Sequence, residues 1–219
     1  MTAATLESCR IAVFAKAPEP GQAKTRLIAR LGADGAARLH ARLVQHAVQT
    51  ALASGAGPVG LWCAPSASHP FFQALASGPA LELRSQIDGD LGRRMADAFR
   101  VVLERAGGAI LIGTDCPART AHDLTQAREA LACGCDAVLG PAEDGGYHLF
   151  ALRRSDPRLF AGVSWGTDRV LAQTRLRLSA LGWRWHELPT RWDVDRPGDL
   201  DRLLADPMLA PLAGDAFVS

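Results

Sequence analysis

The chain has 219 residues, 48% of them hydrophobic and 21% charged, which is enough apolar sequence for one domain with a full core. Its net charge of +1 excludes a general nucleic-acid-binding or membrane-binding surface, because such surfaces need a basic field over a whole face. No apolar run approaches the ~18 residues that span a bilayer, and no secretory signal is recognisable. The five cysteines include no CxxC pair, so we expect buried free thiols in a cytoplasmic protein. We expect a single domain over residues 1–219.

Short apolar runs alternate with amphipathic segments along the chain. The apolar runs predict strands at 10–15, 59–63, 81–85, 109–113, 136–140, 147–152 and 183–188. Apolar residues at helical spacing predict helices at 36–54, 69–76, 91–103, 120–132, 168–181 and 197–204. This β–α alternation predicts an α/β fold with a parallel or mostly parallel sheet and helices on both faces.

Positive charge is concentrated in the loop after the first predicted strand. Positions 16 to 30 hold four basic residues and one acid, a local charge of 4 − 1 = +3 in a chain of total charge +1. The loop is not a P-loop, because Pro18 and Ala23 stand where that motif needs glycines. Lys16, Lys24 and Arg26 precede a helix, whose start attracts anions, so the loop predicts a binding site for nucleotide phosphates. The alternative is a solvated basic loop.

Carboxylates follow three of the later predicted strands. Asp115 in GTDCP follows the fourth strand, Asp144 in AEDGGY the fifth, and Asp193 and Asp195 in WDVD the last. Ligands bind at the carboxyl ends of strands in such sheets, so these loops are expected to gather beside the basic loop. Carboxylates together with cations indicate a phosphate ligand with a divalent metal, Mg²⁺ or Mn²⁺. Asp115 and one of Asp193 and Asp195 are the predicted metal ligands, and Asp144 is a metal ligand or a general base.

Each acidic motif also has a plain structural interpretation. Asp115 can cap the following helix, although Thr120 is better placed to do so, and Asp-Gly is a common hairpin turn. The DxD of aspartyl-phosphate phosphatases belongs on a first strand, whereas WDVD lies near the end of the sequence. No HExxH, GxSxG or GxGxxG occurs, so a zinc protease, an α/β-hydrolase and a nicotinamide-binding Rossmann domain are not indicated.

Taken together, the motifs resemble a family of small bacterial transferases. The segments that carry the resemblance are AVFAKAPEPGQAKTRL, QIDGDLGRRMADAF, LIGTDCP, GPAEDGGYHLFAL, SWGTDRVLAQT and WDVDRPGDLDRL, which cover about residues 10 to 205. The family is that of the radical-SAM/selenodomain-associated transferases, predicted glycosyltransferases of the GT-A, or nucleotide-diphospho-sugar transferase, fold. Some members are described as arsenosugar-biosynthesis glycosyltransferases. The resemblance implies one three-layer α/β/α domain with a nucleotide diphosphate and Mg²⁺ or Mn²⁺ at the carboxyl edge of the sheet.

The resemblance also implies roles for individual residues. Lys24 and Arg26 match the basic residues of the phosphate loop, and Asp115 matches the metal aspartate of the fold. GT-A enzymes often write that motif as DxD, and Gly113 stands at its first position here, as in related nucleotidyltransferases. Asp144 falls where inverting GT-A enzymes place a catalytic base.

Two further segments resemble parts of the family's binding site. WDVDRPGDL, with Asp193 and Asp195, looks like the second metal-binding segment of molybdopterin-nucleotidyl and similar transferases. QIDGDLG, with Gln86 and Asp90 as candidate nucleotide-binding residues, is expected to line the nucleotide or sugar pocket, although nothing in its chemistry specifies the base.

The expected activity is metal-dependent transfer of a sugar from a nucleotide diphosphate sugar to a small acceptor. One alternative is a nucleotidyltransferase that releases pyrophosphate from an NTP. Another is a nucleotide-binding protein without catalysis that works with an enzyme partner. The sequence specifies neither the sugar nor the acceptor.

Overall fold

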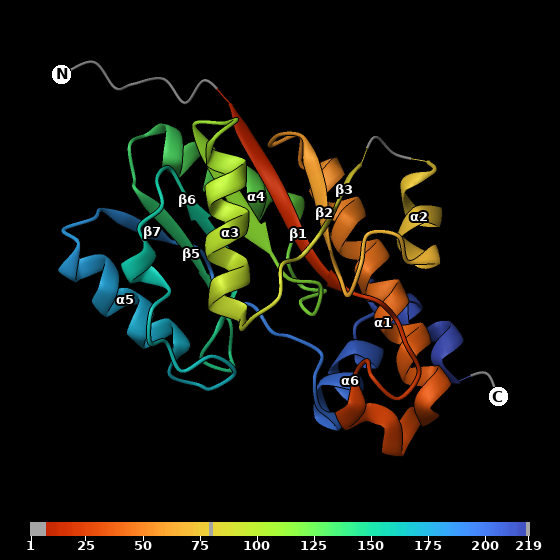
Figure 1. Ribbon diagram of the computed structural model, residues 1–219. Helices are drawn as coiled ribbons and strands as arrows, with labels where there is room; N and C mark the ends of the chain where they lie inside the picture. Colours follow the sequence, from red (N-terminus) through yellow and green to blue (C-terminus); the bar gives the residue numbers. More distant parts are fainter. Residues whose placement is uncertain (1–7, 79–80, 218–219) are drawn as a thin grey trace.

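The structure, a computed structural model, describes residues 8–78 and 81–217. One sheet contains seven strands: β1 (Cys9–Lys16), β2 (Val59–Ala64), β3 (Glu82–Ser85), β4 (Gly108–Ile112), β5 (Ala137–Pro141), β6 (Tyr147–Leu152) and β7 (Trp185–Glu187). Their order across the sheet is β3-β2-β1-β4-β6-β5-β7. β1 pairs in parallel with β2 on one side and β4 on the other, so the basic loop leaves the middle of the sheet (Figure 1).

The sheet is mixed, because β6 runs antiparallel to both of its neighbours, β4 and β5. The other neighbouring pairs are parallel. β5 and β6 are joined by the short turn 142–146, which permits antiparallel pairing without a crossover. The expectation of a mostly parallel α/β sheet is confirmed, with one reversed strand.

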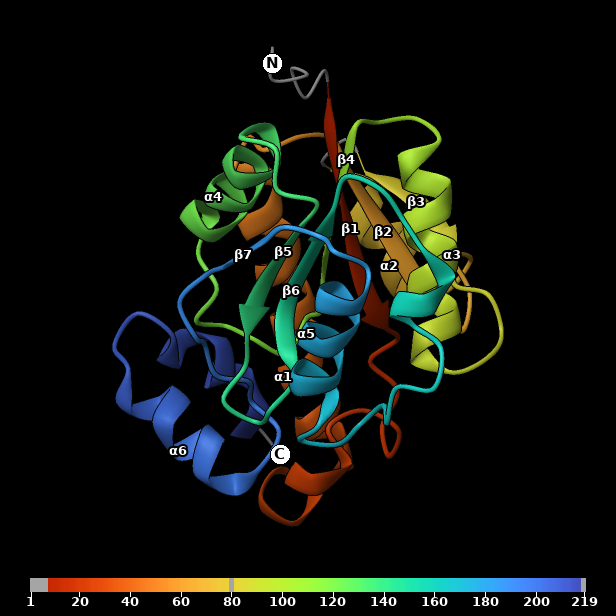
Figure 2. The ribbon, with the colours of Figure 1, turned by 90° about the vertical axis from the view of Figure 1, so that its left-hand side faces the viewer.

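Helices cover both faces of the sheet (Figures 1 and 2). Their bounds are α1 (Ile28–Ala53), α2 (Pro70–Ala76), α3 (Leu91–Leu103), α4 (Ala121–Ala132), α5 (Val170–Ala180) and α6 (Pro197–Ala205). Apolar residues of α1, α2 and α4 pack on one face, and those of α3 and α5 pack on the other. The three-layer α/β/α arrangement is thus confirmed.

A third apolar cluster lies beyond the sheet and carries the end of the chain. α6 and the 3₁₀ segment Ala210–Phe217 pack against the first half of α1 through Leu39, Leu43, Leu200 and Leu203, all fully buried. Figure 1 shows α6 beside α1. This packing returns the segment before α6 to the edge of the sheet where β1 ends.

Several element ends differ from the sequence prediction. α1 begins eight residues earlier than predicted, at Ile28 rather than 36, with a kink at Gly32, whose φ of 68° favours glycine. The 3₁₀ segment near the end of the chain was not predicted. All five cysteines are free, but Cys133 is exposed, so the expectation of buried thiols holds only in part. Within residues 8–78 and 81–217, no helix is long and apolar enough to cross a membrane.

Candidate functional site

The basic loop after β1 delivers its central lysine to a buried position. Lys24 adopts a left-handed conformation, with φ 48° and ψ 44°, which turns the chain into a short 3₁₀ turn ahead of α1. Its side chain is only 4% exposed, and its ammonium donates to the carbonyl of Val194 at 2.7 Å and to Asp195 Oδ1 at 3.0 Å. It also forms an ion pair with Asp115 Oδ1. All three N–H groups of Lys24 are therefore engaged by protein oxygens.

The same ion pairs set the charge state of Lys24 and Asp115. Burial lowers the pKa of Lys24, but the charges of Asp115 and Asp195 outweigh it and hold that pKa above its ordinary value. Burial raises the pKa of Asp115, and the Lys24 ammonium reverses the shift, so the pKa lies below its ordinary value. Lys24 is a cation between two carboxylates.

Asp115 follows β4, the fully buried strand GAILI, at the turn GTDCP. Arg119 holds this turn: it is 2% exposed and donates to the carbonyls of Gly113 at 2.9 Å and His148 at 3.0 Å. The capping of α4 belongs to Thr120, whose hydroxyl accepts from the Asp123 amide in a capping box. Asp115 is therefore not needed as a helix cap, and its side chain, 45% exposed, faces the cleft.

The segment WDVD reaches Asp115 because three contacts guide it there. Arg191 forms an ion pair with the buried Asp123 of α4, with Nη2 to Oδ1 at 2.9 Å. Arg191 also pairs with Ala142 as an isolated parallel bridge beyond β5. The Val194 amide then donates to the Asp115 carbonyl at 2.8 Å. Two motifs far apart in the sequence are thereby joined backbone to backbone.

Like charges gather where these segments meet. Burial, followed by the charges of Asp115, Asp144 and Asp195, raises the pKa of Asp193 to about 7. Lys24 lowers that pKa, but the surrounding carboxylates outweigh it. The structure therefore brings the four predicted aspartates into one electrostatic cluster with too little positive charge to balance it.

Asp144 lies in the turn between β5 and β6. Its Oδ1 accepts from the Gly146 amide at 2.9 Å, which fixes the carboxylate orientation within the turn. Gly145 has a φ of 87°, and a Cβ there would lie 2.2 Å from the Asp168 carbonyl, so only glycine permits this close approach. The neighbouring Glu143 is bound by Arg202 at 2.8 Å. Both acids line the outer cavity, but the Glu143 carboxylate is held in its ion pair with Arg202.

The cleft has three connected cavities at the carboxyl edge of the sheet. The inner cavity, about 610 Å³, is lined by Phe14, Gln86, Asp88, Arg94, Asp115 and Asp193 among others. The outer cavity, about 830 Å³, is lined by Arg26, Asp144, Trp165, Asp168, Asp193 and Asp195 among others. The loop cavity, about 310 Å³, is lined by Lys16, Lys24, Arg26, Asp115 and Asp195 among others. Asp193 is shared by the inner and outer cavities and Asp115 by the inner and loop cavities, so the three form one cleft.

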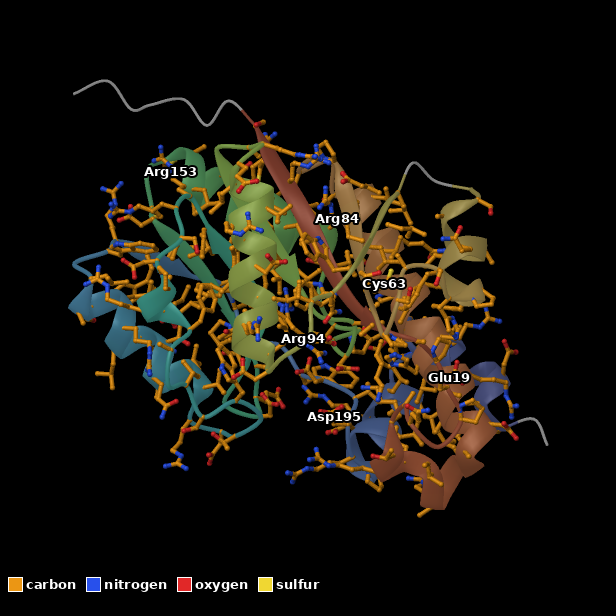
Figure 3. The ribbon with its side chains drawn as sticks, in the orientation of Figure 1. Glu19, Cys63, Arg84, Arg94, Arg153 and Asp195 are labelled. Carbon is orange, nitrogen blue, oxygen red and sulfur yellow. The ribbon has the colours of Figure 1, made fainter. Side chains whose placement is uncertain are left out.

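Most of the sequence-predicted site residues lie along this cleft. Figure 3 shows Arg94 near the beginning of α3 and Asp195 below it in the same region of the molecule. Gln86 lines the inner cavity, and Lys16 and Arg26 line the loop cavity. Asp90 does not line any of the three cavities: it caps α3, with Oδ1 accepting from the Arg93 amide at 2.8 Å.

Arg119, His148, Asp88 and Arg94 were not predicted as site residues, although all four line the inner cavity. Arg119 and His148 are almost fully buried; His148 lies within the segment GPAEDGGYHLFAL, and Arg119 lies two residues after GTDCP. Asp88 lies within QIDGDLG and Arg94 just after it, so proximity to a predicted segment was the one available signal.

The donor set fits a hard divalent cation shared with a ligand. Among the described residues, no group of three or more His, Cys, Asp or Glu side chains is already arranged to hold a metal ion. Mg²⁺ commonly takes only one or two carboxylates and completes its shell with water and substrate phosphates. Asp115 and Asp195 already share one cation, the Lys24 ammonium, and the pKa of Asp193 is raised by burial and then by the neighbouring carboxylates. The residues fit such an ion without forming a closed cage.

The comparisons with known proteins agree with this architecture. A family profile described as an uncharacterized protein conserved in bacteria, DUF2064, matches residues 44–167. The chain belongs to this family. No curated protein matches its sequence.

Solved structures extend the comparison to the whole fold. A crystal structure from Desulfovibrio desulfuricans G20, assigned by inference as a nucleotide-diphospho-sugar transferase, is 28% identical, with 93% of each chain covered and a TM-score of 0.81. A CMP:2-keto-3-deoxy-manno-octonic acid synthetase complexed with CTP is 14% identical over 91% of this chain and 98% of that one, with a TM-score of 0.59. Glucosyl-3-phosphoglycerate synthase from Mycobacterium tuberculosis, in complex with Mn²⁺, UDP and glucosyl-3-phosphoglycerate, is 10% identical over 90% and 75%, with a TM-score of 0.54.

These matches establish the nucleotide-diphospho-sugar transferase (GT-A) fold and structural kinship to transferases that use nucleotides. The last two structures are too distant in sequence to show more than the fold. The resemblance to the radical-SAM/selenodomain-associated transferases stays a prediction.

Proposed function

We propose that this protein is a metal-dependent glycosyltransferase that moves a sugar from a nucleotide diphosphate sugar to a small acceptor. The observation that carries the proposal is the convergence of Asp115, Asp144, Asp193 and Asp195 with basic side chains along one cleft of a GT-A fold. Such folds bind ligands at the carboxyl ends of their strands, where this cleft lies.

The basic loop would hold the diphosphate of the donor. Arg26 makes no hydrogen bond or ion pair with the described residues, and it lines both the loop cavity and the outer cavity. Lys16 lies beside it, with its ammonium donating to the Gln22 carbonyl at 3.0 Å. These two cations would orient the phosphates and stabilise charge on the leaving diphosphate.

Asp115, with Asp193 or Asp195, would hold Mg²⁺ or Mn²⁺. When bound, such an ion supplies Lewis-acid stabilisation of the leaving diphosphate. Asp144 would accept the proton of the acceptor hydroxyl, because its carboxylate is held in place by the Gly146 amide while facing the outer cavity. Trp165 offers that cavity an aromatic wall for an acceptor.

A thermal-shift panel tests the proposal. It uses UDP, GDP, CDP, ADP and TDP, their common sugar conjugates and the matching triphosphates, each with and without Mn²⁺. A ligand at 100 times its Kd stabilises the fold by ~2.7 kcal/mol, or roughly 5–10 °C for a chain of this size. We expect a metal-dependent shift with one diphosphate and its sugar conjugate, and no such shift in Asp115→Ala. A Glu104→Gln variant, exposed at the end of α3, is the matched control.

The absence of any nucleotide-dependent shift in the wild-type protein would overturn the proposal. A metal-dependent shift that survives in Asp115→Ala would remove Asp115 from the metal site while leaving nucleotide binding in place.

A nucleotidyltransferase is the second candidate, and Gly113 favours it. Gly113 stands where many glycosyltransferases of this fold have the first carboxylate of DxD, and a Cβ there would meet no atom within 4 Å. Steric crowding therefore does not explain why a glycine rather than a carboxylate residue stands at this position. Product analysis separates the two reactions, because sugar transfer releases a nucleoside diphosphate and nucleotidyl transfer releases pyrophosphate.

A further inference from the structure

The inner cavity contains a glutamine whose amide is fixed in one orientation. Gln86 Nε2 donates to the Trp62 carbonyl at 2.7 Å and to the Ala15 carbonyl at 3.4 Å. Both partners are acceptors, so the amide cannot turn over without placing oxygen against oxygen. Gln86 is part of the cavity lining, and its Oε1 is left as a hydrogen-bond acceptor. The side-chain amide of a glutamine that can turn over offers a ligand either a donor or an acceptor, whereas Gln86 offers only an acceptor.

Two charged side chains with no protein partner complete the polar lining. Asp88 follows Gln86 in the same loop, lines the cavity, and makes no hydrogen bond or ion pair with the described residues. Arg94 comes from the second turn of α3, and its Nε is buried without a hydrogen-bond partner. A buried unpaired donor is costly, so it indicates an absent acceptor. The cavity therefore presents two acceptors from one loop and a donor from the adjoining helix.

The remaining lining suits a flat ring. Phe14, Pro65, Ile87 and Leu91 contribute apolar surface to the same cavity. The cavity continues to Asp115 and Asp193, where the diphosphate and its metal are placed under the proposed function. A base in the inner cavity would thus be connected through its ribose to phosphates at the loop cavity.

We propose that the inner cavity binds a guanine base, so that the nucleotide donor is a guanosine nucleotide; this rests on the proposed function, which requires a nucleotide in the cleft. Guanine places two neighbouring donors, N1–H and the N2 amino group, beside the acceptor O6. The donors match Gln86 Oε1 and the Asp88 carboxylate, and O6 matches the Arg94 guanidinium. Guanine satisfies all three groups.

Each of the other bases matches these three groups less well than guanine does. Uracil and thymine have one donor, N3–H, between two carbonyls, so one of the two protein acceptors would face a carbonyl oxygen. Cytosine and adenine carry both of their donors on a single amino nitrogen, beside a ring nitrogen that is itself an acceptor, so Gln86 and Asp88 would have to converge on that one nitrogen. An unpaired polar group in a binding site lowers affinity for the wrong ligand, which is how such sites discriminate.

Isothermal titration of the full chain with GDP, IDP, UDP, CDP and ADP, in Mg²⁺, tests the proposal. IDP is GDP without the N2 amino group. We expect GDP to bind about tenfold or more tightly than IDP and the other diphosphates. Asp88→Ala should weaken GDP binding about tenfold while changing IDP binding less, so that the two affinities converge. Glu104→Gln, on the exposed end of α3, should preserve the wild-type preference.

The outcomes separate this proposal from the proposed function. Equal affinity for GDP and IDP, or tighter binding of UDP, CDP or ADP, overturns the guanine assignment and leaves nucleotide-dependent transfer standing. Failure of all five diphosphates to bind overturns both. An Asp88→Ala variant that keeps the full preference for GDP over IDP overturns the role of Asp88, and with it the pairing on which the assignment depends.

Discussion

Replacing Lys24 with methionine would remove the cation from the carboxylate cluster while keeping much of the side-chain volume. Lys24 makes three polar contacts, to Val194, Asp195 and Asp115, and is 4% exposed. Removing one partner of a buried ion pair costs about 3–5 kcal/mol. Because Asp115 is 45% exposed and Asp195 39%, water can solvate part of both carboxylates. We therefore expect Lys24→Met to lower the free energy of unfolding by about 2–3 kcal/mol.

Urea unfolding measures this loss, and comparison with a second variant shows that methionine isolates the electrostatic part. Lys24→Gly loses the same contacts and relieves the left-handed backbone at φ 48°, worth about 1 kcal/mol, but it also empties the buried side-chain volume, which costs about 2–5 kcal/mol. The glycine variant should therefore be less stable than the methionine variant. A loss below about 0.5 kcal/mol for Lys24→Met would refute the argument, since it would mean that the ammonium contributes no more than a surface charge does.

Magnesium should distinguish the same variant from the wild-type protein. In the wild-type protein, an ion that binds Asp115 and Asp195 competes with the ammonium already between them. That competition is absent in Lys24→Met. We expect Mg²⁺ to raise the Tm of the variant by more than it raises the Tm of the wild-type protein. Equal Tm shifts in the two proteins would show that the ammonium and the metal do not compete for the same carboxylates.

Three further predictions test the catalytic, electrostatic and packing arguments. Asp144→Asn should lower kcat by about 10²–10⁴-fold with donor binding unchanged, measured by product release beside calorimetry; an unaltered kcat would exclude Asp144 as the base. Burial, and then the charge of Arg119, lowers the pKa of His148 to about 4. Between pH 6.5 and 4 the unfolded chain gains a proton at this histidine that the folded chain lacks, so the free energy of unfolding should fall by about 3 kcal/mol as the pH drops. Urea unfolding across that range should show a flatter profile in His148→Gln, and parallel profiles would contradict the assignment. At Gly92 a Cβ would lie 2.4 Å from the Trp165 indole nitrogen, so Gly92→Ala should cost about 1–3 kcal/mol in urea unfolding. A stabilisation of about 1 kcal/mol, the ordinary helix preference for alanine, would show that the indole moves freely.

Local sequence was sufficient to predict the layers of the fold. β4 reads GAILI and is buried throughout, and α4 begins with a Thr120–Asp123 capping box, so in both cases the residues that determine the element lie within it. The start of α1 was missed because Gly32 interrupts its pattern with a kink that only tertiary packing tolerates. The reversal of β6 had a visible signal in the Asp-Gly turn, which a β–α alternation argument does not weigh.

The geometry of the site depended on contacts between distant segments. The sequence indicated that Lys24 and the carboxylates share one sheet edge, but it did not indicate that the ammonium would be buried between Asp115 and Asp195. That contact joins positions 171 residues apart for Asp195, and it exists because α6 packs on α1 and returns WDVD to β4. Arg119 is a single arginine without a motif, and no local pattern marks it as the support of the GTDCP turn.

The charges in the cleft argue that a divalent cation is part of the ligand. Two of the four basic residues at positions 16 to 30 are already in ion pairs. Lys24 is paired with Asp115 and Asp195, and Arg30 is paired with Asp201 at 2.6 Å. Lys16 and Arg26 remain to face a diphosphate. Asp115, Asp144 and Asp195 carry 3 negative charges against the one positive charge of Lys24, a surplus of 3 − 1 = 2, and Asp193, with its pKa of about 7, adds a partial negative charge near neutral pH. This surplus of negative charge repels a diphosphate that binds in the neighbouring loop cavity. Lys16 and Arg26 offset only the charge of the phosphates and do not neutralise the aspartates. A divalent ion between the aspartates and the phosphates attracts both, so that their mutual repulsion no longer opposes binding. Nucleotide binding without Mg²⁺ or Mn²⁺ should therefore be weak.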